Sequence, residues 1–243
     1  MKMGAKISVA AALLCSLTLF AGCGKKDDEE KCDLLQADQS QTVKGALNEF
    51  PQRLVIDQRL NAFQQEAVSR AAKTWNVLSN RLIGKDAFSI NVGDVSGMSR
   101  PADCGFTGVP QGTIPVIGED DGGQWSKLQL SKSTLAITRR CTTGKHVDQQ
   151  GVMINVNLVH DPQFSSIALH ELGHSLGLEH SCAGPGETPS DGFVACGGAA
   201  LNHSYLEAVM YPSLGFSPNA GTYEIKEDLR SNDTLRAGCV FKN

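Results

Sequence analysis

The segment that most constrains this chain is His170–His180, which has the sequence HELGHSLGLEH. Residues four apart in a helix lie on one face, about 6 Å apart along the axis, so His170 and His174 can both reach one Zn²⁺ at roughly 2.0–2.1 Å. Gly177 tolerates the positive φ that ends a helix, and the resulting reversal can bring His180 to the same ion. Three protein ligands leave a tetrahedral zinc with one open position, which is typical of catalytic sites.

The open position predicts hydrolytic chemistry. Zinc lowers the pKa of a bound water from about 15.7 toward about 7. Glu171 lies beside the ligands without being an expected ligand, and its carboxylate can take the water proton and return it to a leaving amine. A closed structural site would use thiolates instead, but the sequence contains no Cys-x-x-Cys pair.

Chance is a poor explanation for this segment. A His-Glu-x-x-His sequence alone can arise by accident on an amphipathic helix. Here Gly177 and His180 also stand at fixed offsets, although the whole chain has only six histidines. The sequence therefore predicts one catalytic zinc, bound by His170, His174 and His180.

A second segment, AVMYP at residues 208–212, follows the zinc motif downstream. Together the two segments resemble the metzincin zinc peptidases and are most similar to the matrixin branch, the matrix metalloproteinases. The resemblance implies that Met210 is the Met-turn residue beneath the metal. It also implies that Tyr211 and Pro212 begin the wall of a substrate side-chain pocket. Without the resemblance, Met210 would be interpreted as a flexible core side chain.

The resemblance implies an α/β (α+β) fold of the metzincin type. Such a domain has a five-stranded, twisted, mixed sheet with one antiparallel edge strand, two long helices and a short C-terminal helix. Runs of apolar and β-branched residues predict five strands in this sequence. They are Arg53–Asp57, Phe88–Val92, Thr113–Ile117, Thr134–Arg140 and Gly151–Asn157.

Three helices are expected from periodicity and end signals. Asn61 followed by Gln64 resembles a capping box, and apolar residues then recur at helical spacing as far as Leu82. For the zinc-motif helix, Asp161 is the expected cap and Pro162 the first position. The third helix is expected at Ser231–Gly238, with Ser231 or Asn232 as its cap and Asp233 in its first turn.

The strand Thr134–Arg140 is implied by the resemblance to be the antiparallel edge strand beside the cleft. Its unpaired backbone groups would bind an extended polypeptide substrate as an additional strand. A polar loop with His146 and Asp148 is expected to connect it to the next strand. Matrixins carry a second zinc with a His-x-Asp motif upstream of their edge strand. His146-Val147-Asp148 lies downstream, so we expect no second zinc, and His146, His160 and His203 to be exposed or satisfied polar residues.

An acidic run in the sequence is a candidate calcium site. The acidic run at residues 118–123, GEDDGG, can supply oxygen ligands to Ca²⁺, and matrixins hold calcium in comparable surface loops. A solvated turn explains the same composition, because the run lacks the spacing of an EF-hand.

The N-terminus predicts export. Lys2 and Lys6 precede an apolar run from Ile7 to Ala21, which is too short for a good membrane span and is typical of a signal peptide. The run ends in LFAGC, which resembles a bacterial lipobox with Cys23 as the acylated residue, although Phe20 replaces the usual leucine. The alternatives are ordinary secretion with cleavage nearby, and a disulfide role for Cys23.

Composition and these motifs divide the chain into three parts. Residues 1–22 form a lipoprotein-type signal peptide, 23–45 a lipid-anchored tether rich in charge, and 46–243 a catalytic domain. With 243 residues, 41% apolar content and a net charge of −4, the chain can form one ordinary core and has no basic excess that would attract nucleic acid. We expect a monomer on a bacterial membrane, facing the periplasm or the cell exterior.

The cysteines predict disulfides in an exported chain. Setting aside Cys15 and Cys23 leaves an even set. Its members are Cys32, Cys104, Cys141, Cys182, Cys196 and Cys239. The sequence leaves most pairings open, and only Cys182 with Cys196 is favoured, because both lie in the loop Ser181–Val209. This loop is longer than the corresponding segment of matrixins, and we call it the insertion.

These features favour an exported zinc endopeptidase that acts on polypeptides. One alternative is a zinc-containing binding or adhesion lipoprotein without turnover, although the intact Glu171 argues against it. Another is a latent precursor. The cysteine-switch propeptide of matrixins is missing, and RPADCG at residues 100–105 matches neither its motif nor its place.

Overall fold

The computed structural model describes residues 50–98, 108–110, 112–120, 123–131, 133–143, 146–189, 193–198, 203–213, 216–217, 222–223 and 225–242. The predicted signal peptide, the tether and Cys23 lie outside these residues, as do Cys32 and Cys104. No helix in the described part of the chain is long and apolar enough to span a bilayer.

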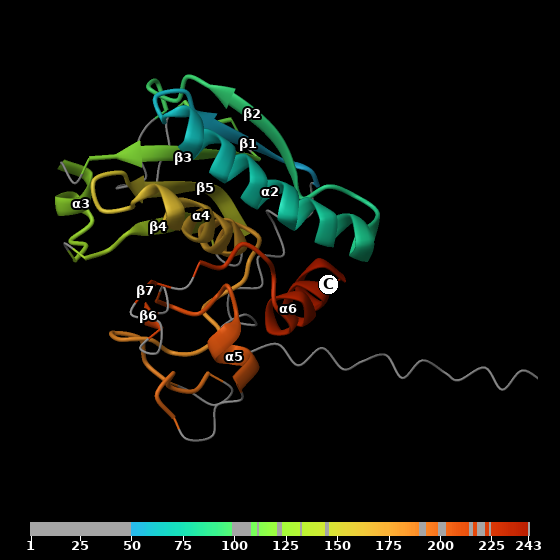
Figure 1. The fold of residues 1–243 in the computed structure, drawn as a ribbon. Coiled ribbons are helices and arrows are strands. Elements are labelled where there is room, and N and C mark those ends of the chain that lie inside the picture. The colour runs from blue at the N-terminus through green and yellow to red at the C-terminus, as the bar shows by residue number, and fades with distance from the viewer. Residues whose placement is uncertain are drawn as a thin grey trace, which may run out of the picture. The chain divides into compact units, whose positions relative to one another are not determined.

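A five-stranded sheet with the order β2-β1-β3-β5-β4 forms the centre of the fold (Figure 1). Its strands are β1 (Gln52–Asp57), β2 (Phe88–Gly93), β3 (Thr113–Glu119), β4 (Ala136–Thr143) and β5 (His146–Asn155). Strand β1 pairs in parallel with β2 and β3, and β3 pairs in parallel with β5. Strand β4 pairs antiparallel with β5. The predicted five-stranded mixed sheet with an antiparallel edge strand is therefore present.

The hairpin that joins β4 to β5 is longer than predicted. The expected polar loop around His146 and Asp148 is wrong, because both residues belong to β5 and His146 pairs with Thr143. The pairing continues past a register shift between Cys141 and Thr142. Polar residues alternate with few apolar ones at this hairpin end, so the sequence there lacks the apolar enrichment that identifies a strand.

Helices α2 (Ala62–Ile83) and α4 (Asp161–Ser175) lie side by side over one face of the sheet (Figure 1). The predicted capping box of α2 is present: Gln64 N–H donates to the Asn61 side chain, and Asn61 N–H donates to the Gln64 side chain. The predicted Asp161 cap of α4 is wrong. His160 is the cap residue, with extended backbone and no side-chain cap bond, and Asp161 begins the helix. A carboxylate in the first turn still stabilises the helix dipole.

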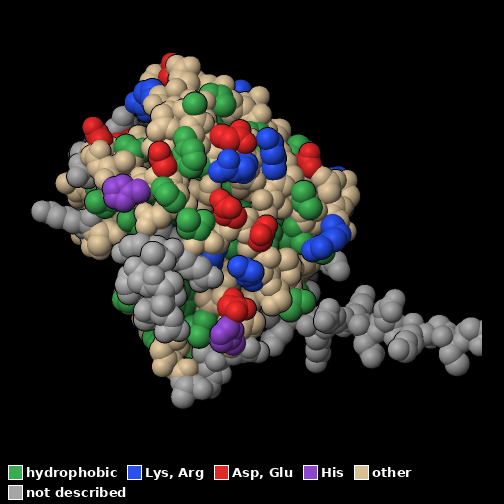
Figure 2. All heavy atoms as spheres, viewed as in Figure 1, with side chains coloured by type: hydrophobic (Ala, Val, Ile, Leu, Met, Phe, Trp, Pro, Cys, Tyr) green, Lys and Arg blue, Asp and Glu red, His purple; other side chains and the backbone are tan. Residues whose placement is uncertain are grey.

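The remaining elements are shorter. Helix α6 extends from Ser231 to Lys242, beyond the predicted end at Gly238, and Ser231 and Asn232 lie inside it rather than capping it. The others are α3 (Gly123–Lys127), α5 (His203–Glu207), β6 (Phe216–Ser217) and β7 (Thr222–Tyr223). On the face shown in Figure 2, acidic and basic side chains are interspersed.

The core fills the space between the sheet and the two helices α2 and α4. Trp75 of α2 is completely buried there, and its Nε1–H donates to the Leu169 carbonyl of α4 at 2.9 Å. Leu169, Leu172 and Leu176 are buried in the same cluster and form the apolar side of the segment that carries the zinc motif. This packing fixes α4 against α2, and with it the histidines that α4 carries.

Candidate metal centre

Three histidine rings converge at the end of α4. His170 and His174 lie one helical turn apart, and α4 ends after Ser175, with Gly177 at φ 94°. The chain reversal at this glycine brings His180 back to the helix, as the sequence predicts. The ring centroids are 4.7 Å apart for His170 and His174, 4.8 Å for His174 and His180, and 5.2 Å for His170 and His180. Potential ligand atoms of the three side chains lie within 4.8 Å of one another.

The Nδ1 atom of each ring has a hydrogen-bond acceptor. His170 Nδ1 lies 2.7 Å from the Val209 carbonyl, and His174 Nδ1 lies 2.8 Å from the Leu178 carbonyl. His180 Nδ1 lies 2.7 Å from Glu187 Oε1. Carbonyl oxygens only accept, so Nδ1 carries the proton in His170 and His174, and the lone pair is on Nε2. Metal-binding histidines in proteins almost always have such a partner on the second nitrogen, and this donor set fits zinc.

The protein environment keeps two of the rings in the neutral form that binds metal. Burial, reinforced by repulsion from His180, lowers the pKa of His170 to about 3. Burial and the neighbouring histidines also lower the pKa of His174 well below its usual value. Neither ring therefore needs to lose a proton at neutral pH before it can bind a cation.

Glu171 is buried beside the three rings. Burial raises the pKa of its carboxyl to about 7, and a hydrogen bond from Thr138 opposes this rise. The Thr138 hydroxyl lies 2.7 Å from Glu171 Oε2 and 2.8 Å from the Glu171 carbonyl, so it can donate to either oxygen. A carboxyl whose pKa lies near neutral can both accept and donate a proton at physiological pH.

A cavity of about 680 Å³ opens beside Glu171. Edge strand β4 contributes Ala136 and Ile137 to its lining. Tyr211 and Pro212, the predicted pocket residues, line it from the segment after Met210. Glu171, His170 and His180 form the part of the lining where α4 meets the chain reversal, and Pro185 adds a residue of the insertion.

Met210 packs beneath α4 and is completely buried. A Cβ atom added to Gly173, between Glu171 and His174, would lie 2.3 Å from Met210 Sδ and 3.0 Å from Trp75 Cζ2. The helix can therefore lie this close to Met210 because Gly173 has no side chain. Met210 also accepts, through its carbonyl, a hydrogen bond of 2.7 Å from Ser181 N–H.

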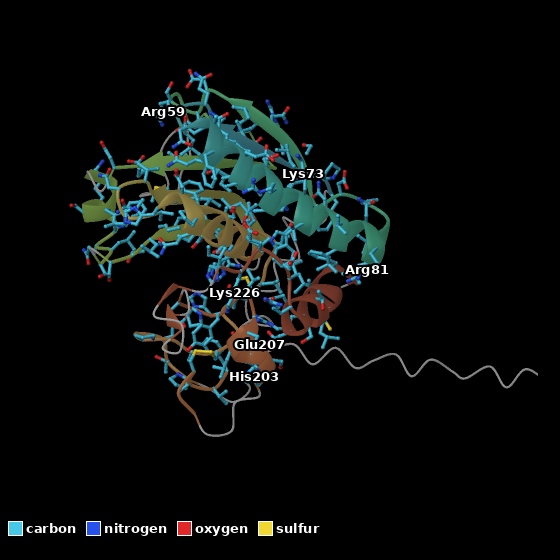
Figure 3. The ribbon with its side chains drawn as sticks, viewed as in Figure 1. Arg59, Lys73, Arg81, His203, Glu207 and Lys226 are labelled. Atoms are coloured by element: carbon cyan, nitrogen blue, oxygen red, sulfur yellow. A yellow bond between two sulfur atoms is a disulfide. The ribbon has the colours of Figure 1, made fainter. Side chains whose placement is uncertain are left out.

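Helix α6 binds the backbone of two segments of the site, one at Val209 and Met210 and the other at Glu179. The Asp233 carboxylate accepts from Val209 N–H at 2.9 Å and from Met210 N–H at 3.1 Å. Val209 is also the residue whose carbonyl orients His170. Arg236 Nη2 donates to the Glu179 carbonyl at 2.7 Å. Lys226, labelled in Figure 3, adds a further contact at this turn. Its Nζ donates to the Ala208 carbonyl at 2.7 Å.

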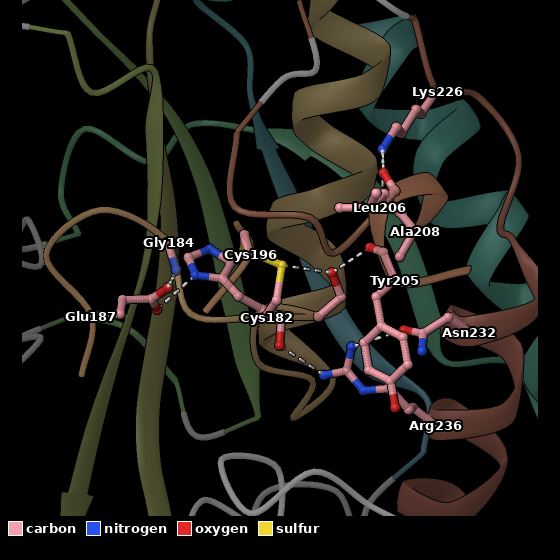
Figure 4. Close-up of a disulfide and its surroundings, with 12 residues drawn as sticks. Cys182, Gly184, Glu187, Cys196, Tyr205, Leu206, Ala208, Lys226, Asn232 and Arg236 are labelled. Atoms are coloured by element: carbon pink, nitrogen blue, oxygen red, sulfur yellow. Dashed lines mark hydrogen bonds and ion pairs between the residues drawn. A yellow bond between two sulfur atoms is a disulfide. The ribbon is translucent and has the colours of Figure 1, made fainter. Parts of the chain in front are cut away.

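The insertion contains the predicted disulfide between Cys182 and Cys196 (Figure 4). Cys141 and Cys239 each take part in a disulfide as well. At the base of the insertion, Ala183 and Ala195 form a β-bridge.

Three groups of the site were not predicted from the sequence: Thr138, Glu187 and Arg236. Thr, Glu and Arg are common residue types and form no recognisable motif at these positions. Their places in the site follow from contacts that only the folded chain makes. Asp233 was predicted only as a first-turn acid of the C-terminal helix.

The predicted calcium run is partly a strand. Gly118 and Glu119 end β3, and Glu119 is buried. Asp121 and Gly122 lie outside the described residues. Within the described ranges, the group of side chains able to hold a metal is the histidine triad. Calcium binding at this run stays a prediction. His160 and His203 are exposed, as expected, and His203 pairs with Glu207 on α5.

Comparison with known proteins gives little to assign the chain. No protein-family model matches it, and no curated protein matches it either. Two structures of myroilysin are similar, both with a TM-score of 0.37. The first is 14% identical and covers 78% of this chain and 92% of its own, and the second is 13% identical and covers 88% and 96%. Neither likeness assigns a fold or an activity at this TM-score.

Substituting Gly173 by alanine tests the packing beneath the metal centre. Glycine to alanine inside a helix normally stabilises by about 0.5–1 kcal/mol. Here the new methyl group meets Met210, so we expect a net loss of about 1–3 kcal/mol in the free energy of unfolding, the usual cost of overpacking. Urea denaturation measures the change. Gly197→Ala is the control, because no heavy atom beyond the neighbouring residues lies within 4 Å of the added Cβ. A Gly173→Ala variant more stable than wild type would contradict the packing.

Proposed function

We propose that this protein is a zinc-dependent endopeptidase of the metzincin type. One observation carries the proposal: three imidazoles converge with Nδ1 hydrogen-bonded away from the centre, next to the buried carboxyl of Glu171. Burial of a carboxylate is unfavourable, and groups perturbed in this way concentrate at functional sites. The cavity beside Glu171 gives a substrate access to this carboxyl.

His170, His174 and His180 would hold the metal through Nε2. A zinc ion bound there would acidify a water molecule and polarise the scissile carbonyl. Glu171 would take a proton from the attacking water and deliver it to the amine of the leaving fragment. Thr138 would keep the Glu171 carboxylate aimed at the reacting atoms, because its hydroxyl reaches Oε2 at 2.7 Å.

A polypeptide substrate would bind along β4. This strand pairs with β5 on one side and is at the edge of the sheet on the other. Its outer backbone groups can pair with an extended chain, and β4 residues line the cavity together with Glu171. Tyr211 and Pro212 would then form the wall of the pocket that receives the side chain next to the scissile bond.

Replacing Glu171 by alanine should separate binding from turnover. The variant is expected to keep zinc, because the three imidazoles are unchanged, and to lose hydrolysis by several orders of magnitude. In His180→Ala, zinc affinity itself should fall. Metal content after dialysis and cleavage of an unfolded protein, with and without a chelator, measure both properties. A zinc-binding module without turnover would show no chelator-sensitive cleavage in wild type. Equal activity in wild type and Glu171→Ala would reject Glu171 as the base.

Thr138 offers a finer test of the same chemistry. Thr138→Val keeps the shape of the side chain but removes the hydroxyl that orients Glu171, so kcat should fall about 10-fold or more, with zinc affinity unchanged. Thr138→Ser retains the hydroxyl and should recover most of the lost kcat. A valine variant as active as the serine variant would show that the hydrogen bond has no part in turnover.

We further propose that the protein is exported and anchored in a bacterial membrane through acylated Cys23. The LFAGC segment at residues 19–23 supports this proposal. The mass of the mature protein decides between the anchor and secretion. An acylated N-terminal cysteine is expected, and Cys23→Ala should release the protein from membranes. An unmodified mature N-terminus would favour ordinary secretion.

A further inference from the structure

The third candidate ligand is oriented differently from the other two. His170 and His174 are held by main-chain carbonyls, those of Val209 and Leu178. These acceptors are present whichever side chains stand at positions 209 and 178. His180 is held by a side chain, the carboxylate of Glu187 in the insertion. The orientation of His180 therefore depends on the identity of one residue.

A tight turn places this carboxylate. Glu187 N–H donates to the Gly184 carbonyl at 3.1 Å, with Pro185 second and Gly186 third in the four-residue turn. Gly186 has φ 88°, and proline followed by a positive-φ glycine is typical of a type II turn. Glu187 Oε2 accepts from Gly184 N–H at 2.6 Å, which leaves Oε1 for His180 (Figure 4).

The rest of the insertion holds the turn in place. A Cβ atom on Gly184 would lie 2.8 Å from Pro212 Cβ, so the turn packs directly on the segment that follows Met210. Ala183 N–H donates to the Val194 carbonyl at 2.8 Å, and the disulfide between Cys182 and Cys196 joins the same two segments. The turn is therefore held on both sides, which places the Glu187 carboxylate beside His180.

We propose that Glu187 is a positioning residue for the metal ligand His180. This inference rests on the proposed zinc site. A carboxylate that accepts a hydrogen bond from Nδ1 fixes the ring orientation. It also makes Nε2 more basic and therefore a stronger metal ligand. The insertion thus contributes to metal affinity through Glu187 without contacting the ion.

Zinc affinity measured by competition with a chromogenic chelator tests the inference. In Glu187→Ala the dissociation constant for zinc should rise about 10–100-fold. Glu187→Gln should fall between this variant and wild type, because its amide oxygen can accept from His180 but its NH₂ group cannot accept from Gly184. Glu207→Gln is the matched control. Glu207 lies in the same insertion and pairs with the exposed His203 (Figure 3), so zinc affinity should not change.

A spectroscopic measurement separates positioning from general loosening of the loop. In the zinc-loaded wild type, the Nδ1–H proton of His180 should exchange slowly with water in NMR spectra. In Glu187→Ala only this signal should be lost, whereas those of His170 and His174 persist. Wild-type zinc affinity in both Glu187 variants, or a His180 signal that survives in Glu187→Ala, would overturn the inference. Failure of wild type to bind zinc would refute the proposed function itself.

Discussion

The candidate metal centre depends on three hydrogen bonds that point away from it. Each imidazole has its Nδ1 next to an acceptor, and the two carbonyl acceptors permit only one tautomer. With Nδ1 as donor, Nε2 is the remaining atom that can bind a cation. The three acceptors must therefore be held in place together: Leu178 lies after α4, Glu187 lies within the insertion, and Val209 ends the insertion just before Met210.

The surrounding fold holds the backbone around these acceptors in position. Asp233 of α6 accepts the N–H groups of Val209, Met210 and Arg230, and charge-assisted bonds of this kind contribute about 1.5–3 kcal/mol each. Arg236 of the same helix binds the backbone next to His180. On the other side of the centre, Met210 fits under α4 because Gly173 has no side chain. Helix α6 and Gly173 thus fix the candidate metal ligands relative to the hydrophobic core.

The sequence predicts those parts of the site that are local. His170 and His174 are related by one helical turn, and Gly177 supplies the positive φ that returns His180, so spacing alone is sufficient for the triad. The five strands and the edge position of β4 also follow from pattern and resemblance. Contacts between distant segments do not: Thr138 lies 33 positions from Glu171, and Asp233 lies 24 from Val209. At the β4–β5 hairpin end the strand residues are mostly polar, so their sequence resembles that of a loop. The cap of α4 lies one residue before the predicted position, because proline fits both of the first helical positions.

The proposed site would bind one ion with three imidazoles through Nε2 and leave a position for water. The zinc K-edge X-ray absorption spectrum of the zinc-loaded protein tests it most directly. For a three-histidine site with one bound water we expect four light-atom ligands at roughly 2.0–2.1 Å, with outer-shell scattering from three imidazole rings. A sulfur ligand at about 2.3 Å, or scattering from fewer than three imidazoles, would contradict it.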